Sequence, residues 1–301
     1  MSKRNKNAIR TTSPIGDAVI VIFMLCAGAL CILPILNVLA ISLSSNAAAA
    51  SGKVKFWPVD LTFNSYSYAL ARPQFIRSFA ISLERVALGL PINMIFTVLA
   101  AYPLSKNRYE LTGRTVYAWF FFFTMIFNGG LIPWFIVVKL TGLMDTMWGL
   151  VIPRAIQVYY VILLMNFFRQ IPRELSEAAY VDGASEIKIL FNIYLPLSLP
   201  SLATLSLYMV VFHWNDWFDG LILMKNADKY PLQTYLQSVV IERDPNVLMH
   251  ASVEELKKLA ELSNRSLRSA QIFIAALPIL ALYPFLQKYF MKGLILGGVK
   301  G

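Results

Sequence analysis

The chain has 301 residues, of which 57% are hydrophobic and 15% charged, and its mean hydropathy is +0.58. An ordinary soluble domain contains about 45–50% apolar residues, so this composition excludes a typical soluble protein. The net charge of +10 does not require a nucleic-acid ligand, because membrane proteins concentrate Lys and Arg in their cytoplasmic loops.

The first predicted element is a membrane span near the N-terminus. The basic segment 1–17 precedes an apolar run from Ala18 to Leu43. A cleaved signal peptide has an apolar core of about 7–15 residues, so this longer run predicts a span that stays attached. Cys26 and Cys31 lie within the run, five residues apart and on different helix faces. We interpret them as packing residues rather than as a disulfide or a metal site.

Windows of about 20 apolar residues, the length that crosses the hydrocarbon core, predict six membrane-spanning helices. Several contain proline, which neighbouring helices in a membrane bundle can accommodate. The predicted chain is an all-α, polytopic membrane protein, with a transmembrane domain at 18–290 between an N-terminal segment, 1–17, and a C-terminal tail, 291–301. The six spans are expected at residues 18–43, 79–103, 116–138, 149–168, 197–223 and 271–290.

Loop charges predict the orientation of these spans. The connection "SKNRYELTGR" is basic, whereas "KLTGLMDTMW" has one Lys and one Asp. Lys and Arg favour the cytoplasmic side, so both termini are expected there and the long loops 44–78 and 224–270 outside. Within the second long loop, Ser252 and Glu255 form a capping-box pattern that predicts a helix. That helix would either lie on its own protein or dock an external partner.

An acidic segment separates the fourth and fifth predicted spans. Apolar residues recur at spacings of three and four on both sides of Gly183, which predicts two short amphipathic helices joined by a glycine turn. A helix resting on lipid headgroups carries Lys and Arg on its polar face, whereas this face is mainly acidic. The segment is therefore predicted to bind a protein. Four of the chain's 17 acids fall within thirteen residues here: Glu174, Glu177, Asp182 and Glu186.

This segment resembles a motif of a known family. Glu177-Ala178-Ala179, Gly183, Ile193 and Leu195-Pro196 match the EAA loop of importer-type ABC transporter permeases at every fixed position. The stretches "NGGLIPWF", "HWNDWFDGLI" and "GLILGGVKG" look like the MalG-type carbohydrate importer permeases, and more narrowly like their LplC/YtcP-like branch. The resemblance extends over almost the whole chain.

The resemblance implies a type I ABC importer permease fold in the bacterial cytoplasmic (inner) membrane. It also implies import of oligosaccharides by alternating access, with acidic ones such as alginate or pectin fragments as one possibility. The implied partners are a second homologous permease, a pair of cytoplasmic ATPase subunits and an extracytoplasmic solute-binding protein. The tail 291–301 would reach toward the ATPase. The implied ATPase-coupling residues are Glu177, Ala178, Ala179, Asp182, Gly183, Ile193, Leu195 and Pro196.

The sequence shows no motif for chemistry of its own. It contains no G-x-x-x-x-G-K-[ST] phosphate loop, no H-E-x-x-H pattern and no Cys cluster. We therefore expect no catalytic residue, no metal and no cofactor on this chain. ATP and Mg would be bound by the partner ATPase.

A polar and aromatic cluster lies near the outer end of the fifth predicted span. A central membrane Asp costs about 2.5–3.5 kcal/mol on insertion scales, so such a group usually faces the protein interior or a water path. Aromatic faces beside carboxylates and amides suit a sugar, although tryptophans also form belts at the headgroup level. The candidate substrate-path residues are Trp214, Asn215, Asp216, Trp217 and Asp219.

Two arginines lie near the outer ends of the second and fourth predicted spans. Arg85 and Arg154 are expected to snorkel to the interface, with attraction of an acidic sugar as the second possibility.

The alternative function is an ion-coupled secondary transporter that uses Asp216 and Asp219 as a proton relay. Such transporters usually contain inverted repeats with interrupted helices at matching places, and the sequence shows no such repeat.

The predicted topology can be tested by thiol labelling. A cysteine replacing Ser105 or Ser185 should react only with membrane-permeant reagents, because both positions are expected in the cytoplasm. One replacing Ser51 or Ser252 should also react with impermeant reagents. Labelling of Ser185→Cys by an impermeant reagent on intact cells would overturn the six-span arrangement.

Overall fold

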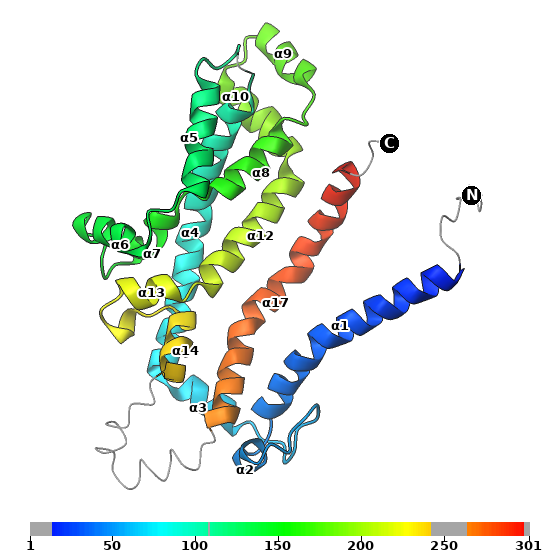
Figure 1. The fold of residues 1–301 in the computed structure, drawn as a ribbon, viewed down its shortest axis with the longest axis vertical. Coiled ribbons are helices and arrows are strands. Elements are labelled where there is room, and N and C mark those ends of the chain that lie inside the picture. Colours follow the sequence, from blue (N-terminus) through cyan, green and yellow to red (C-terminus); the bar gives the residue numbers. More distant parts are fainter. Residues whose placement is uncertain (1–13, 108, 242–263, 298–301) are drawn as a thin grey trace. The chain divides into compact units, whose positions relative to one another are not determined.

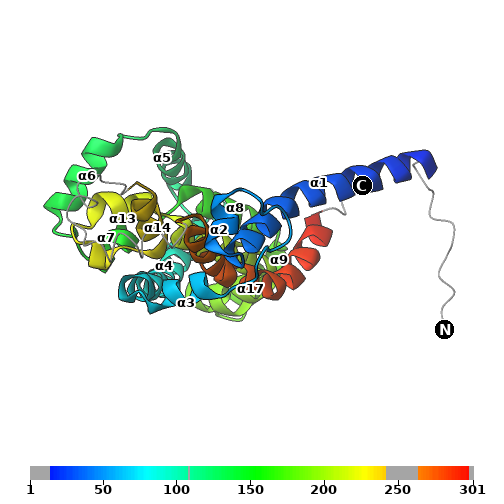
Figure 2. The same cartoon turned by 90° about the horizontal axis from the view of Figure 1, so that it is seen from below.

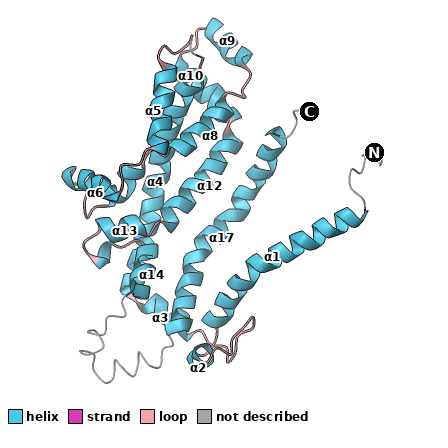
Figure 3. Ribbon diagram, viewed as in Figure 1, coloured by secondary structure: helices cyan, strands magenta, loops and turns pink. Residues whose placement is uncertain are grey.

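A computed structural model describes residues 14–107, 109–241 and 264–297, and within these ranges the chain is helical without a β-strand (Figure 1, Figure 3). The chain divides into two compact units. The first comprises residues 1–71 and 245–274, and the second comprises residues 72–244 and 275–301. The helix predicted from Ser252 lies outside the described residues.

The first unit is dominated by one long apolar helix. The chain from Ile15 to Ser42 is long and apolar enough to cross a membrane, and none of its most apolar window is buried. Cys26 and Cys31 are exposed on it, so neither packs within this unit as expected. A small core follows where Ala40 and Ile41 meet Ala48, Ala49 and Val54. The helices of this unit are α1 (Pro14–Ser42), α2 (Asn46–Ala50), α3 (Asn64–Ala71) and the first part of α17 (Asn264–Gly297).

The second unit is a bundle built around α4 (Pro73–Ser105), which packs against α8 (Val158–Phe168) and α12 (Leu199–Asn215) (Figure 1). Its other elements are α5 (Arg114–Ile126), α6 (Leu131–Leu140), α7 (Met147–Val151), η1 (Ile152–Arg154), α9 (Arg173–Val181), α10 (Glu186–Ile189), the π-helical turn η2 (Leu190–Tyr194), α11 (Leu195–Leu197), α13 (Phe218–Leu223), η3 (Ala227–Lys229), α14 (Leu232–Ile241) and the rest of α17.

Small and polar side chains let α4 approach its neighbours closely. Helices in a membrane gain little from burying apolar surface, so they pack through small residues and polar contacts. At Gly89 the approach is so close that a Cβ atom would lie 2.5 Å from Nε2 of His213 on α12. The buried residues along this face of α4 recur every three or four positions: Ser78, Ser82, Arg85, Gly89, Asn93, Thr97 and Ala101.

The predicted spans coincide with these helices, but three of them are bent. Within the described residues, three helices are long and apolar enough to cross a membrane alone, and up to six spans result if each bent pair counts as one. The chain bends by 112° between α5 and α6, where α6 turns away from α5 (Figure 2), by 48° before α8 and by 81° before α12. The fifth predicted span, 197–223, is also interrupted, because α12 ends at Asn215 and α13 begins at Phe218.

Large apolar surfaces remain exposed on the second unit. No residue of α5 is buried, and its aromatic side chains Trp119, Phe120 and Phe123 are exposed. Soluble monomers rarely expose such continuous apolar patches, so this face is suited to lipid or to another membrane subunit.

Near the C-terminus α17 continues to Gly297, so the predicted tail 291–301 begins as helix.

Candidate functional site

The acidic segment 172–196, here called the coupling segment, has the helix–turn–helix form that the sequence predicts. α9 ends at Val181, and Gly183 follows with φ +75°, the left-handed conformation that glycine adopts without strain. The Gly183 and Ala184 N–H groups donate to the carbonyl oxygens of Tyr180 and Ala179 at 3.0 and 2.9 Å. The chain then enters α10, whose N-cap Ser185 accepts a hydrogen bond from the Lys188 N–H.

The predicted coupling residues fall into two groups. Those that pack partly against the core of the second unit are Ala179, Ile193 and Leu195. Those that are exposed are Glu177, Ala178, Asp182, Gly183 and Pro196. Apolar side chains accompany the exposed acids, with Val181 88% and Ile187 70% exposed. A surface that mixes exposed apolar and acidic groups in this way suits a protein partner better than an anionic lipid surface.

A second polar site, the charge cluster, lies where α12 ends and consists of Arg85, Arg154, Asp216 and Asp219. Arg85 on α4 is completely buried, and its Nη2 lies 2.6 Å from Asp216 Oδ2 and 3.5 Å from Asp219 Oδ2. It also donates to the backbone carbonyl oxygens of Asp216 and Leu150, at 3.1 and 3.2 Å. The buried guanidinium therefore has both charge compensation and hydrogen-bond acceptors.

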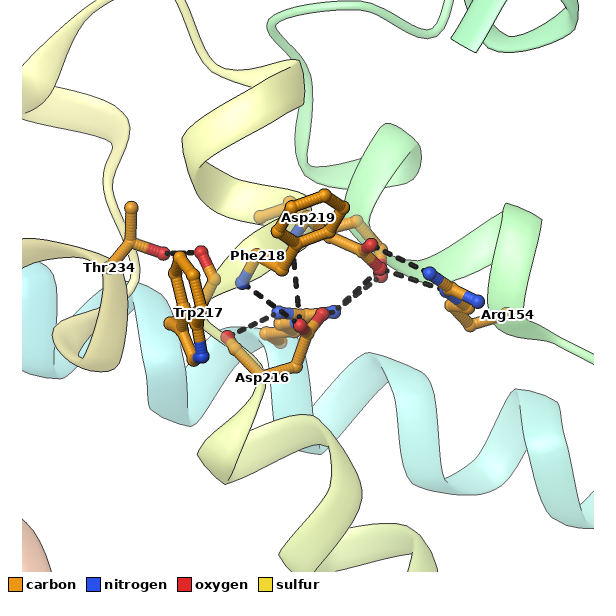
Figure 4. A network of polar contacts seen from close by, with 8 residues as sticks. Arg154, Asp216, Trp217, Phe218, Asp219 and Thr234 are labelled. Atoms are coloured by element: carbon orange, nitrogen blue, oxygen red, sulfur yellow. Dashed lines mark hydrogen bonds and ion pairs between the residues drawn. The ribbon is translucent and has the colours of Figure 1, made fainter. Parts of the chain in front are cut away.

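Arg154 completes the cluster from the opposite side (Figure 4). Its Nε and Nη2 donate to the two carboxylate oxygens of Asp219 at 3.0 and 2.9 Å, a bidentate pair. Its side chain is 39% exposed, and its guanidinium carbon lies 5.1 Å from the ring centroid of Trp134. Two cations thus face two anions, with one arginine inside and the other reaching the surface.

These contacts correct the expectation for the two arginines. Arg85 does not snorkel, because it is buried and paired, and Arg154 is held by Asp219 although part of it is exposed. Both aspartates are paired with guanidinium groups, the arrangement expected for acidic side chains held inside a membrane protein. Asp216 also accepts hydrogen bonds from the Phe218 and Asp219 N–H groups, at 3.1 and 3.4 Å, at the start of α13 (Figure 4).

The five candidate path residues face different surroundings. Trp214 is buried, and its Nε1 donates to the Ala275 carbonyl oxygen at 2.9 Å. Asp219 is buried within the charge cluster, and Asp216 is half-buried. Asn215 and Trp217 are exposed, and the backbone carbonyl of Trp217 is held by the Thr234 hydroxyl at 2.8 Å. Trp217 is therefore the aromatic side chain of this group that is open to a ligand.

Sequence reasoning missed that Arg85 and Arg154 belong with the aspartates. Arg85 and Asp216 are 131 positions apart, so no local pattern reports their contact. The available signal was charge balance, because two aspartates near the outer end of one span call for cations on neighbouring spans.

Several apolar helices with exposed apolar faces, interrupted by a helix break that carries paired charges, define a polytopic membrane protein. The chain belongs to the family described as "Binding-protein-dependent transport system inner membrane component", whose pattern matches residues 19–296. It is an ABC importer permease, so the alternative of an ion-coupled secondary transporter is wrong.

Relatives and a solved structure match over nearly the full length. Protein LplC of Bacillus subtilis (strain 168) is 40% identical over 95% of this chain and 95% of its own. The polygalacturonan/rhamnogalacturonan transport system permease protein YtcP of the same organism is 36% identical, over 95% of this chain and 98% of its own. A chain in the crystal structure of a bacterial ABC transporter involved in the import of the acidic polysaccharide alginate is 33% identical, with a TM-score of 0.82 over 92% of this chain and 96% of that one.

The charge cluster predicts a large difference between two arginines of α4. Arg85→Met should destabilise the protein by about 3–5 kcal/mol, because it leaves the largely buried Asp216 carboxylate without its cation and Asp219 with Arg154 alone. Arg77→Met is the matched control, since Arg77 pairs with Asp228 at the surface, where an ion pair contributes about 0–1 kcal/mol. Thermal unfolding of the purified complexes in detergent measures both. Equal unfolding temperatures for the two variants would contradict the buried role of Arg85.

Proposed function

We propose that this chain is one permease subunit of an importer for oligosaccharides that carry carboxylate groups. The relatives support this substrate class, since one is described as a polygalacturonan/rhamnogalacturonan permease and the matched crystal structure as an importer of the acidic polysaccharide alginate. Pectin and alginate fragments share a chemistry of apolar ring faces, hydroxyl groups and carboxylates. A site for them needs aromatic faces and a cation.

The observation that carries this proposal is the exposed edge of the charge cluster. Arg154 uses one edge of its guanidinium for Asp219 and lies over Trp134, while the rest of its partly exposed side chain is open to a further acceptor. Guanidinium groups bind carboxylates in a planar, bidentate manner and stack on aromatic rings. A sugar carboxylate on Arg154 and a sugar ring against Trp217 would match this chemistry.

The transporter is proposed to contain further subunits. A second homologous permease would complete the path across the membrane, and an extracytoplasmic solute-binding protein would deliver the sugar. A pair of cytoplasmic ATPase subunits would bind ATP and Mg and carry out hydrolysis, because this chain has no phosphate-binding loop. Both termini and the coupling segment would then lie in the cytoplasm.

The proposed mechanism is alternating access driven through the coupling segment. Its exposed residues Glu177, Ala178, Asp182 and Gly183 would contact the ATPase, whose closure on ATP would move α9 and α10. An equilibrium between outward- and inward-open states shifts only as far as its ligands discriminate between those states. ATP would supply that discrimination on the inner side, and the loaded binding protein on the outer side.

The substrate proposal is tested with the reconstituted transporter in vesicles. Binding protein loaded with oligogalacturonides should stimulate ATP hydrolysis and uptake more than the same protein offered neutral galacto-oligosaccharides. Trp217→Ala should lower uptake by up to about tenfold, the equivalent of an aromatic contact of about 0.5–1.5 kcal/mol. Trp217→Phe should retain more activity, because a ring face remains. Equal uptake of charged and neutral sugars would refute the acidic class, and unchanged uptake in Trp217→Ala would remove Trp217 from the path.

The coupling role is tested at Gly183. Gly183→Val places a β-branched side chain in a left-handed turn, a strain of about 1–2 kcal/mol, and should redirect α10 against the ATPase. Gly142→Val is the matched control, because Gly142 has φ +73° and, like Gly183, no atom within 4 Å of an added Cβ, yet lies outside the coupling segment.

We expect the Gly183 variant to insert into the membrane and to lose stimulated hydrolysis and uptake, with the co-purified ATPase quantified in the same samples. The Gly142 variant should keep both activities. Equal activity of the two variants would show that the turn at Gly183 has no special part in coupling.

A further inference from the structure

A buried lysine lies where α4 meets the coupling segment. The Lys106 side chain is only 7% exposed, and its Nζ lies 3.2 Å from Glu186 Oε2 and 3.1 Å from the Tyr180 hydroxyl. Three aromatic rings surround the ammonium group, with Nζ 4.6, 5.4 and 5.2 Å from the ring centroids of Tyr102, Tyr180 and Tyr194. These five residues are called the Lys106 cluster below.

The cluster satisfies the charge of Lys106 from several sides. The Glu186 carboxylate also accepts hydrogen bonds from the Tyr102 hydroxyl, at 2.5 Å, and from the Tyr180 hydroxyl. Burial alone would lower the pKa of Lys106, but its contacts with Tyr102 and Tyr180 outweigh burial and raise that pKa above the ordinary lysine value. The lysine is therefore charged at neutral pH and is attracted both to the carboxylate and to the ring faces.

The Lys106 cluster connects the end of α4 with three elements of the coupling segment: α9, α10 and η2. Tyr102 lies in the last turn of α4 and Lys106 is the C-cap residue that follows it. Tyr180 belongs to α9, Glu186 to α10 and Tyr194 to η2. α9 precedes Gly183 and α10 follows it, and apart from its chain neighbours no residue has an atom within 4 Å of the position that a Gly183 Cβ would take. One ammonium group thus ties both helices of the coupling segment to the same end of α4.

α4 continues from this contact to the charge cluster. From Lys106 to Arg85 the helix covers about 30 Å at about 1.5 Å per residue. Its buried face packs against α8 and α12 along this length. A displacement of the coupling segment that moves Lys106 would therefore also move α4. At its other buried cation, Arg85, α4 contacts Asp216, where α12 ends.

We propose that Lys106 is a positioning residue that transmits movement of the coupling segment to α4. This inference rests on the proposed function, since it assumes that an ATPase moves the segment. Lys106 need not contact the ATPase, because it is buried beneath the exposed residues of α9 and α10. Its removal should leave the docking surface in place and separate ATP hydrolysis from transport.

The experiment compares Lys106→Met with Lys139→Met in the full reconstituted transporter. Lys139 is exposed in the last turn of α6 and serves as the matched control for loss of one lysine charge. For Lys106→Met we expect normal co-purification of the ATPase and a normal basal rate. The ratio of stimulated to basal hydrolysis, and uptake, should each fall about tenfold, within the range typical of coupling between sites. Lys139→Met should retain both.

Two further variants separate positioning from general stability. Lys106→Arg keeps a cation over the rings and should recover part of the stimulation. Tyr180→Phe keeps the ring but removes the hydroxyl that contacts Lys106 and Glu186, so it should give an intermediate ratio even if Lys106→Met is poorly produced.

The outcomes distinguish this inference from the proposed function. A wild-type complex without ATPase, or without stimulation by loaded binding protein, would refute both. A stimulated wild type together with wild-type ratios in Lys106→Met, or in Tyr180→Phe where the first variant does not assemble, would refute only the role of Lys106. Loss of ATPase attachment in Tyr180→Phe would also refute it, because the cluster would then serve docking rather than transmission.

Discussion

A charged side chain cannot remain among apolar helices without a partner, and this constraint fixes the position of α4 at two places. Arg85 is buried along one part of the helix, and Lys106 is buried at its end. Their acidic partners come from distant parts of the chain, Asp216 and Asp219 for the arginine and Glu186 for the lysine. Moving α4 alone would separate a buried cation from its carboxylate, which disfavours movement of the helix without the segments that neutralise it.

The helices of the chain present two kinds of surface. The buried face of α4 uses Gly89, Ala101 and small hydroxyl residues to approach α8 and α12 closely. The faces of α1 and α5, by contrast, carry large apolar side chains that the described chain leaves exposed. In lipid, apolar surface contributes little to helix association, so small and polar residues supply the specificity of the bundle. The bulky faces are then available to lipid and to further subunits.

The sequence allowed some of these features to be predicted because their causes are local. Long apolar runs located the spans, and a glycine between two amphipathic stretches located the turn at Gly183. The bends before α8 and α12 were not predictable, because proline only permits a bend and tertiary contacts decide whether it forms. The pairing of Arg85 with Asp216 depends on packing between distant residues. Tyr102 in the last turn of α4 and its C-cap residue Lys106 are close in the sequence, but nothing local identifies Glu186 as their partner.

At the end of α12, the buried pair of Arg85 and Asp216 supports the residues that would contact a ligand, although Arg85 itself is not exposed. Breaking a helix in a membrane frees backbone groups that need partners. Arg85 satisfies one of these groups by donating a hydrogen bond to the Asp216 carbonyl oxygen. The Asp216 carboxylate in turn accepts hydrogen bonds from the first N–H groups of α13. The resulting break keeps Trp214 inside, bonded to Ala275, and turns Trp217 outward. In the proposed path the sugar would meet Trp217 and Arg154, yet the orientation of both depends on aspartates that Arg85 holds in place.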